Sequence, residues 1–134
     1  MPTPNQIVNT MMAKDYFSQW LGIEVLEVKK GYSKLQMTVR EDMLNGFGIA
    51  HGGITYSIAD SALAFASNSH GQKAVSVETS ISHTISLKAG DVIIAEAIEE
   101  HCSNKIGIYT VKIYTISETV ALFKGTVYRT SKEW

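Results

Sequence analysis

One stretch of the chain, residues 52–68, carries almost no charge, and this limits most strongly how the chain can fold. The segment GGITYSIADSALAFASN has an apolar helical pattern, and Asp60 is its only charged side chain. A helix on the surface of a protein usually carries a charged stripe on its outer side. We therefore expect this helix to be covered on most sides, by a sheet on one side and, through its small Ala and Ser residues, by a second subunit on another.

The segments on either side of this helix predict an α+β fold. Apolar residues recur every three or four positions over residues 5–21, which predicts a first helix that Gly22 ends. Alternating apolar residues predict a hairpin of two strands over residues 23–40. Four more strands are predicted after the long helix, at residues 74–87, 92–100, 105–116 and 121–129. We expect a curved antiparallel sheet with helices on one face, formed by residues 1–134 as one domain.

Composition and charge exclude several other classes of protein. The 134 residues are 45% hydrophobic and 19% charged, which is ordinary for one globular domain. There are 12 basic and 13 acidic side chains, a net charge of −1, without the basic excess of a nucleic-acid-binding protein. The one cysteine, Cys102, cannot form an internal disulfide, and residues 1–6 have no secretory-signal pattern. The longest apolar stretch, residues 54–66, is too short and polar to span a bilayer, so we expect a cytoplasmic protein without membrane partners.

Asp60 stands where a carboxylate has no local benefit. Asp is a poor helix former, and burying an unpaired carboxylate is costly. No Lys or Arg lies one helical turn away, where the chain has Tyr56 and Ala64. A carboxylate in such a place is a candidate general base or nucleophile. The alternative is that Asp60 only accepts hydrogen bonds from nearby hydroxyl groups or caps a loop.

The start of the same helix has the features of an oxyanion-binding site. Here His51 is followed by Gly52 and Gly53, and two glycines leave backbone N–H groups open to close approach by a ligand. The helix dipole favours negative charge at this end, as in the stabilisation of a tetrahedral acyl-transfer intermediate. The alternative is that the glycines only form a flexible entry to the helix.

Geometry separates these two features along the helix. Asp60 is eight positions after Gly52, so the two are about 12 Å apart at 1.5 Å per residue. One reacting carbonyl needs both an oxyanion donor and a base within about 3 Å. If both groups act on one carbonyl, they must come from two chains whose long helices lie antiparallel. The functional hypothesis therefore predicts a dimer with two shared sites.

The order of short motifs resembles a known family. The motifs are LNG at residues 44–46, AHGG at 50–53, SIAD at 57–60 and ASN at 66–68. Their combination resembles the hotdog-fold acyl-CoA thioesterases, above all the PaaI-like branch of phenylacetic acid degradation, over about residues 21–129. In that family a sheet wraps around a long central helix, and the chains form dimers and often tetramers. The resemblance implies a homodimer, and further a homotetramer, that acts on an acyl-CoA without a separate cofactor, because coenzyme A is part of the substrate.

The same resemblance implies roles for individual residues. Asp60 matches the catalytic carboxylate, and the N–H of Gly52 from the partner chain matches the group that polarises the thioester carbonyl. Asn45 matches a residue that orients the water or the substrate, and His51 matches a position beside the thioester. The further substrate-binding positions that we expect are Gly53 and Ser76, the latter a hydroxyl position that some relatives use near the water.

This sequence departs from the family pattern in one segment. Relatives often have an aromatic residue and then a proline before the Ala89-Gly90-Asp91 turn, where this chain has His83 and Ser86. The departure concerns the shape of the acyl or pantetheine channel and not the expected catalytic residues. We expect His83 to be a partly exposed strand residue without a role, and contact with a ligand is the alternative. The four histidines have no metal-ligand spacing, and with a single cysteine the sequence predicts no metal site.

Two other functions remain open at the level of sequence. A hotdog dimer that binds an acyl-CoA or another hydrophobic ligand without cleaving it has the same fold, but such a protein gains nothing from an isolated carboxylate at Asp60. A hotdog hydratase or dehydratase places a catalytic His and Asp close together in a different motif, which the spacing of His51 and Asp60 does not match. Hydrolysis of an acyl-CoA thioester, such as phenylacetyl-CoA or a hydroxylated derivative, is therefore the first hypothesis.

Overall fold

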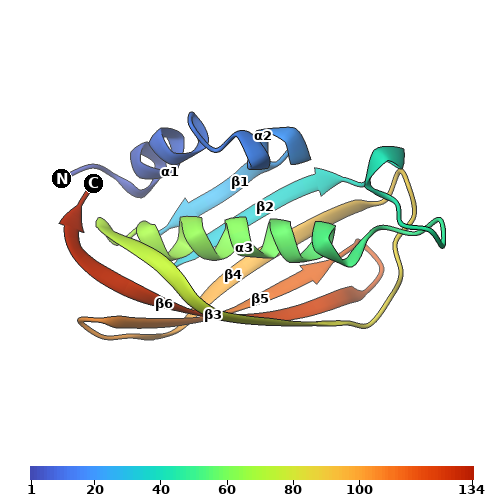
Figure 1. The fold of residues 1–134 in the computed structure, drawn as a ribbon. Coiled ribbons are helices and arrows are strands. Elements are labelled where there is room, and N and C mark those ends of the chain that lie inside the picture. The colour runs from blue at the N-terminus through green and yellow to red at the C-terminus, as the bar shows by residue number, and fades with distance from the viewer.

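A long helix lies across a curved sheet in the computed structural model, which describes residues 1–134 (Figure 1). The elements follow in the order α1 (Pro4–Met12), α2 (Tyr16–Leu21), β1 (Glu24–Lys29), β2 (Tyr32–Thr38), the short 3-10 helix η1 (Glu41–Met43), α3 (Gly52–Asn68), β3 (Gln72–His83), β4 (Val92–Cys102), β5 (Ile106–Tyr114) and β6 (Thr119–Glu133). The predicted α+β fold is confirmed, and the N-terminal helix differs from the prediction.

All six strands form one antiparallel sheet in the spatial order β1-β2-β4-β5-β6-β3. The antiparallel pairing is as predicted. However, β3 and β4 follow each other in the chain without being neighbours in the sheet, because residues 84–91 cross from its edge to its middle. β3 pairs instead with β6, from Gln72 opposite Glu133 to His83 opposite Ala121. β3 is therefore an edge strand of the sheet.

Two of the predicted strand ends differ from the structure. The last strand was expected over residues 121–129, but it extends over Thr119–Glu133 because it pairs with β5 on one side and β3 on the other. The strand after the long helix was expected to reach Leu87, but it ends at His83, where the crossover to β4 begins. Local residue patterns do not show either of these long-range contacts.

The predicted helix over residues 5–21 is wrong, because the structure has two helices there. Asp15 accepts the N–H of Ser18 with its side chain at 2.9 Å and so caps α2, which begins at Tyr16. The apolar spacing continues across the break, so the pattern alone predicts one helix. Gly22 ends α2 as expected, in the left-handed conformation with φ of 75°.

The core lies between α3 and the concave face of the sheet. Ile58, Phe65 and Ala66 of α3 are fully buried, and burial of a side chain such as Phe65 contributes about 1.5–3 kcal/mol. Gly125 of β6 lets the helix approach closely, since a Cβ there would lie 2.5 Å from Cδ2 of Leu63. This close packing fixes α3 relative to the sheet. Neither α3 nor any other helix is long and apolar enough to cross a membrane.

Candidate active site

The first turn of α3 presents an unpaired backbone N–H at Gly52. His51 caps the helix, because its Nδ1 accepts the N–H of Gly53 at 2.9 Å and its carbonyl oxygen accepts the N–H of Ile54. The N–H of Gly52 has no acceptor within the chain. At the positive end of the helix dipole, such a donor is suited to stabilise negative charge on a ligand oxygen. The capping bond also occupies the N–H of Gly53. Gly53 therefore has no free donor for a ligand, and it contributes only the space left by its missing side chain.

Gly52 lines a cavity of about 330 Å³ together with Asn45. The loop before α3, the first turn of α3 and residues 83–87 form its walls. Oδ1 of Asn45 accepts the N–H of Phe47 at 2.9 Å and thereby holds the loop, while the side-chain NH₂ group makes no hydrogen bond within the chain. The structure thus places Asn45 and Gly52 in one cavity. The side-chain NH₂ group of Asn45 and the backbone N–H of Gly52 are both free to donate hydrogen bonds.

The same cavity contains His83, for which the sequence analysis expected no role. Nε2 of His83 lies 2.7 Å from Oγ1 of Thr55, and that hydroxyl donates to the carbonyl of Gly52 at 3.0 Å. A Cβ on Gly52 would lie 3.2 Å from Cε1 of His83, so the imidazole sits against this glycine. The departure from the family pattern at residue 83 is the sequence feature from which this position could have been found. His83 and Thr55 are therefore additional members of the candidate site.

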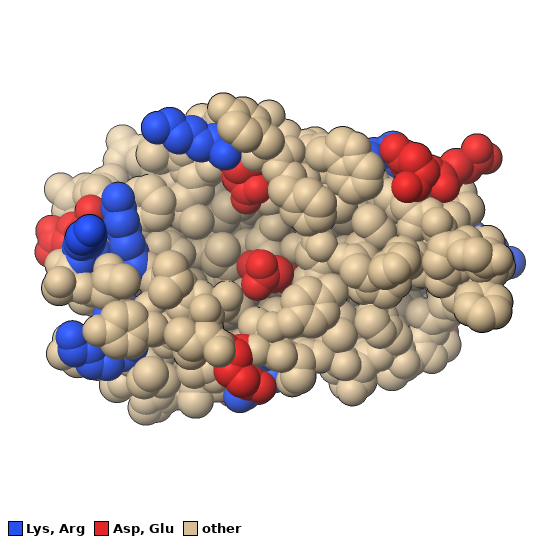
Figure 2. Space-filling view, in the orientation of Figure 1, with Lys and Arg blue, Asp and Glu red and all other residues tan.

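Asp60 lies on an open stripe of α3, on the side of the helix for which the sequence analysis expected cover by a second subunit. The stripe contains Gly53, Ser57, Asp60 and Ala64, which are all exposed or half-buried, whereas the opposite face is buried. The sheet and the two N-terminal helices leave this stripe uncovered in the single chain. Figure 2 shows the surface over α3 as largely uncharged, with isolated acidic groups on it and most basic groups toward its margins.

The surroundings of Asp60 raise its pKa above the ordinary value for aspartate. Although the side chain is exposed, neighbouring atoms partly desolvate the carboxylate, and this is the largest cause. The negative charge of Asp15 is the second cause. A carboxylate with a raised pKa is a better proton acceptor once it is ionised, which suits a general base.

Asp15 is held beside Asp60 by a chain of hydrogen bonds that joins α2 to α3. Oγ of Ser18 donates to Asp15 at 2.6 Å and lies 2.8 Å from Oγ of Ser61, the residue after Asp60. Ser18 and Ser61 are both buried. The sequence analysis missed this element because 43 residues separate the two serines and no local pattern relates them.

The structure separates the expected site residues into two groups. Asp60 and Ser76 line one hollow of about 270 Å³, which lies between α3 and the edge strand β3. Asn45 and Gly52 line the cavity at the start of the helix, and the two hollows share no residue. The spacing of about 12 Å along α3 between Gly52 and Asp60 therefore holds in the folded chain. A single chain does not bring its own Gly52 and Asp60 to one carbonyl.

Known proteins share both the sequence and the fold of this chain. The family model described as thioesterase superfamily matches residues 47–122. A putative esterase of Archaeoglobus fulgidus is 37% identical over 130 residues, covering 96% of this chain and 84% of the relative. The acyl-coenzyme A thioesterase PaaI of Escherichia coli is 36% identical over 125 residues, covering 92% of this chain and 89% of the relative.

Solved structures extend the similarity to the whole fold. The Escherichia coli PaaI protein from the phenylacetic acid degradation operon superimposes with a TM-score of 0.94 at 34% identity, covering 97% of this chain and 95% of that one. A Streptococcus mutans protein solved bound to acetyl CoA superimposes with a TM-score of 0.81 at 26% identity, covering 84% of this chain and 91% of that one.

These similarities define the class of protein. The chain belongs to the thioesterase superfamily and has its hotdog fold, with the sheet wrapped around α3. Within that family it is PaaI-like, and it is a thioester hydrolase. The expected resemblance is thereby confirmed, whereas the roles of Asp60, Gly52, Asn45, His51, Gly53 and Ser76 stay predictions.

Proposed function

We propose that this protein hydrolyses an aryl-acyl-CoA, such as phenylacetyl-CoA or a hydroxylated derivative, to the free acid and coenzyme A. The observation that carries the proposal is the free N–H of Gly52 on the same helix that presents Asp60. The names of PaaI and of the acetyl CoA complex of the Streptococcus mutans protein support coenzyme A thioesters as substrates. The reaction consumes only the thioester and water, so we propose that no cofactor takes part, and we expect it to occur in the cytoplasm.

In the proposed chemistry, Gly52 and Asp60 have separate roles. The N–H of Gly52 donates to the thioester oxygen and stabilises the negative charge that develops on it. Asp60 removes a proton from a water molecule, whose oxygen attacks the carbonyl carbon. When the C–S bond breaks, the acid forms and the thiolate of coenzyme A leaves and takes up a proton. In the other form of the mechanism, Asp60 attacks the carbonyl carbon itself and the thiolate of coenzyme A leaves as the C–S bond breaks. Water then hydrolyses the resulting anhydride to the free acid and the Asp60 carboxylate.

The other residues would position the reactants in this scheme. The free NH₂ group of Asn45 is available to orient the water or the substrate. His51 holds the first turn of α3 by its capping bond and so fixes the direction of the Gly52 N–H. Ser76 shares the hollow with Asp60 and is available for a hydrogen bond to the water, while the missing side chain of Gly53 leaves room for the thioester.

We further propose that two chains form each site, with their α3 helices antiparallel. The open stripe of small residues on α3 allows close approach of a second helix. The edge strand β3 beside it exposes Val75 (56%) and Val77 (61%), apolar side chains that a second chain would cover. This arrangement brings Gly52 of one chain toward Asp60 of the other. A homotetramer built from two such dimers is the further assembly that we expect.

A thiol-release assay over a panel of acyl-CoAs tests the proposed activity. The wild-type protein is expected to release coenzyme A from aryl-acyl-CoAs with a kcat/KM higher than from aliphatic acyl-CoAs of similar size. Equal or better turnover of the aliphatic substrates would contradict the proposed acyl class but not thioester hydrolysis. Tight binding of every acyl-CoA without release of thiol would contradict hydrolysis and favour a binding protein.

A further inference from the structure

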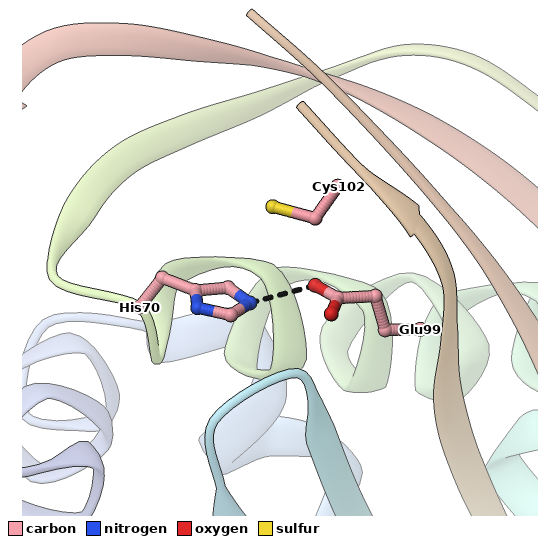
Figure 3. A group of neighbouring side chains, drawn as sticks. All are labelled: His70, Glu99 and Cys102. Atoms are coloured by element: carbon pink, nitrogen blue, oxygen red, sulfur yellow. Dashed lines mark hydrogen bonds and ion pairs between the residues drawn. The ribbon is translucent and has the colours of Figure 1, made fainter. Parts of the chain in front are cut away.

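A cluster of three potential metal ligands lies beyond the C-terminal end of α3. It consists of His70, directly after the helix, and of Glu99 and Cys102 near the end of β4. The ligand atoms of the three side chains all lie within 4.8 Å of one another. Figure 3 shows the imidazole of His70 facing the carboxylate of Glu99, with the sulfur of Cys102 directed toward the same space. No step of the proposed reaction uses these residues.

The backbone around the cluster is arranged to hold Glu99 in this place. The β1–β2 turn passes beside its carboxylate at Gly31, which has a φ of 74°, and a Cβ on Gly31 would lie 3.0 Å from Oε2 of Glu99. The N–H of Glu99 donates to the carbonyl of Gly31, and the N–H of Gly31 donates to Oγ of Ser69. Three separate segments of the chain thus meet at the cluster. Only a glycine at this turn leaves room for the carboxylate.

The surrounding side chains leave the ligand atoms of the cluster accessible to a metal ion. Oε1 of Glu99 accepts hydrogen bonds from the hydroxyl of Tyr109 at 2.8 Å and from Nε2 of His70 at 2.6 Å. The Tyr109 bond is of the kind that orients a metal-binding carboxylate from the second shell. His70 and Glu99 are 21% and 27% exposed, and Cys102 is exposed, so an ion can enter from solvent. The positive charge of Arg129 acts on Cys102, and Nη1 of its guanidinium donates to the carbonyl of Ser103 at 2.6 Å.

We propose that His70, Glu99 and Cys102 form a binding site for a zinc ion, with water as the fourth ligand. One nitrogen, one oxygen and one sulfur donor form a mixed set of the kind that zinc accepts. A tetrahedral zinc ion with bonds of about 2.0–2.3 Å holds its ligand atoms roughly 3.3–3.7 Å apart. Binding therefore requires the bonded atoms of His70 and Glu99, now 2.6 Å apart, to separate by roughly 0.7 Å, and Cys102, whose sulfur lies within 4.8 Å of both ligand atoms, to come into the same coordination shell. Side-chain rotation at this half-exposed site supplies such movements.

The ion would tie the end of α3 to the central strand β4. His70 and Glu99 are 29 positions apart in the chain, and this distance explains why the spacing of the histidines in the sequence predicted no metal site. The helix α3 ends at Asn68, roughly 24 Å from Gly52 and roughly 12 Å from Asp60 at 1.5 Å per residue, and the cluster lies beyond that end. The zinc ion is therefore structural, and it stabilises the folded chain because the unfolded chain does not hold the three ligands together.

The test uses untagged protein kept reduced without a thiol compound, since an affinity tag or a thiol would itself bind metal. Wild-type protein is expected to bind one Zn²⁺ per chain in calorimetry, and Zn²⁺ should raise the Tm reversibly with a chelator. Co²⁺ in place of Zn²⁺ should give the charge-transfer absorption of a thiolate ligand. Cys102→Ser should remove this absorption, and both Cys102→Ser and His70→Ala should lower the Zn²⁺ affinity at least about 10-fold.

The matched control is His101→Ala, because His101 lies on the same strand but outside the cluster. This variant is expected to keep the Zn²⁺ affinity and the Co²⁺ absorption of the wild type. A wild-type Co²⁺ spectrum without thiolate absorption overturns the proposal, whatever the variants do. Zn²⁺ binding that persists in both Cys102→Ser and His70→Ala overturns it as well, because the ion then binds elsewhere.

Discussion

The variant Asp60→Asn is expected to lower the kcat of thioester hydrolysis by about 10²–10⁴-fold, the usual contribution of a general base. Asn has nearly the same shape as Asp but cannot accept the proton of the attacking water or act as a nucleophile. KM is expected to change little, because the carboxylate acts on the reacting water and not on the coenzyme A portion. A thiol-release assay with wild-type and variant protein at several substrate concentrations measures both constants.

The Asp60→Asn variant should fold and assemble as the wild type does. The raised pKa of Asp60 means that its ionised form is less stable in the folded chain than in water, so removal of the charge costs no stability.

In the wild type, kcat/KM should rise with pH as Asp60 ionises and level off above its raised pKa. Asp15→Asn is the matched control, since Asn also caps helices. Asp15→Asn should keep most activity and move the acid limb of the pH–rate profile to lower pH. Near-normal turnover in Asp60→Asn would refute the role of Asp60.

The variant Gly52→Pro is expected to lower kcat by about 10²–10³-fold, the typical effect of removing one oxyanion-hole donor. Proline has no N–H, and it is favoured at the first position of a helix. The preceding residue, His51, has φ of −60° and ψ of 138°, a conformation that a residue before proline prefers. The substitution therefore removes the donor with little change to α3. Steady-state kinetics with the best acyl-CoA and the Tm of the variant measure the two effects.

The control for this variant is Gly52→Ala, which keeps the N–H and adds only a Cβ. That Cβ would lie 3.2 Å from Cε1 of His83, so the imidazole must shift by a few tenths of an ångström. We expect a smaller loss of kcat in Gly52→Ala than in Gly52→Pro. Equal losses in the two variants would mean that contact with His83, and not the N–H, limits the reaction.

The central part of the fold could be predicted because its signals are local. The charge-poor segment of α3 and the alternating strands follow from the spacing of apolar residues over a few turns or pairs. The break between α1 and α2 could not be predicted in the same way, because the apolar spacing continues past Asp15. The pairing of β3 with β6 joins residues that are far apart in the chain, so neither the strand order nor the length of β6 followed from local patterns.

Some residues of the candidate site could likewise be predicted from sequence, and others could not. Asp60 and Gly52 could be selected from sequence, since one is the only charge in an apolar helix and the other begins it. Asp60 is exposed in the single chain, and the burial expected for it stays a prediction because it depends on cover by a second subunit. His83 and Asp15 reach the site through tertiary contacts with Thr55 and with the Ser18–Ser61 pair. Such contacts have no signal in residue spacing.

The most direct test of a site shared between two chains is complementation between Gly52→Pro and Asp60→Asn. In a mixed dimer, one site combines the intact Gly52 of one chain with the intact Asp60 of the other, and the second site has neither. Random mixing should therefore restore about one quarter of the wild-type activity, since half of the dimers are mixed and each has one working site of two. Purified mixed dimers, isolated through two different tags after co-expression, should show about half. Mixed dimers as inactive as either parent would contradict the shared site.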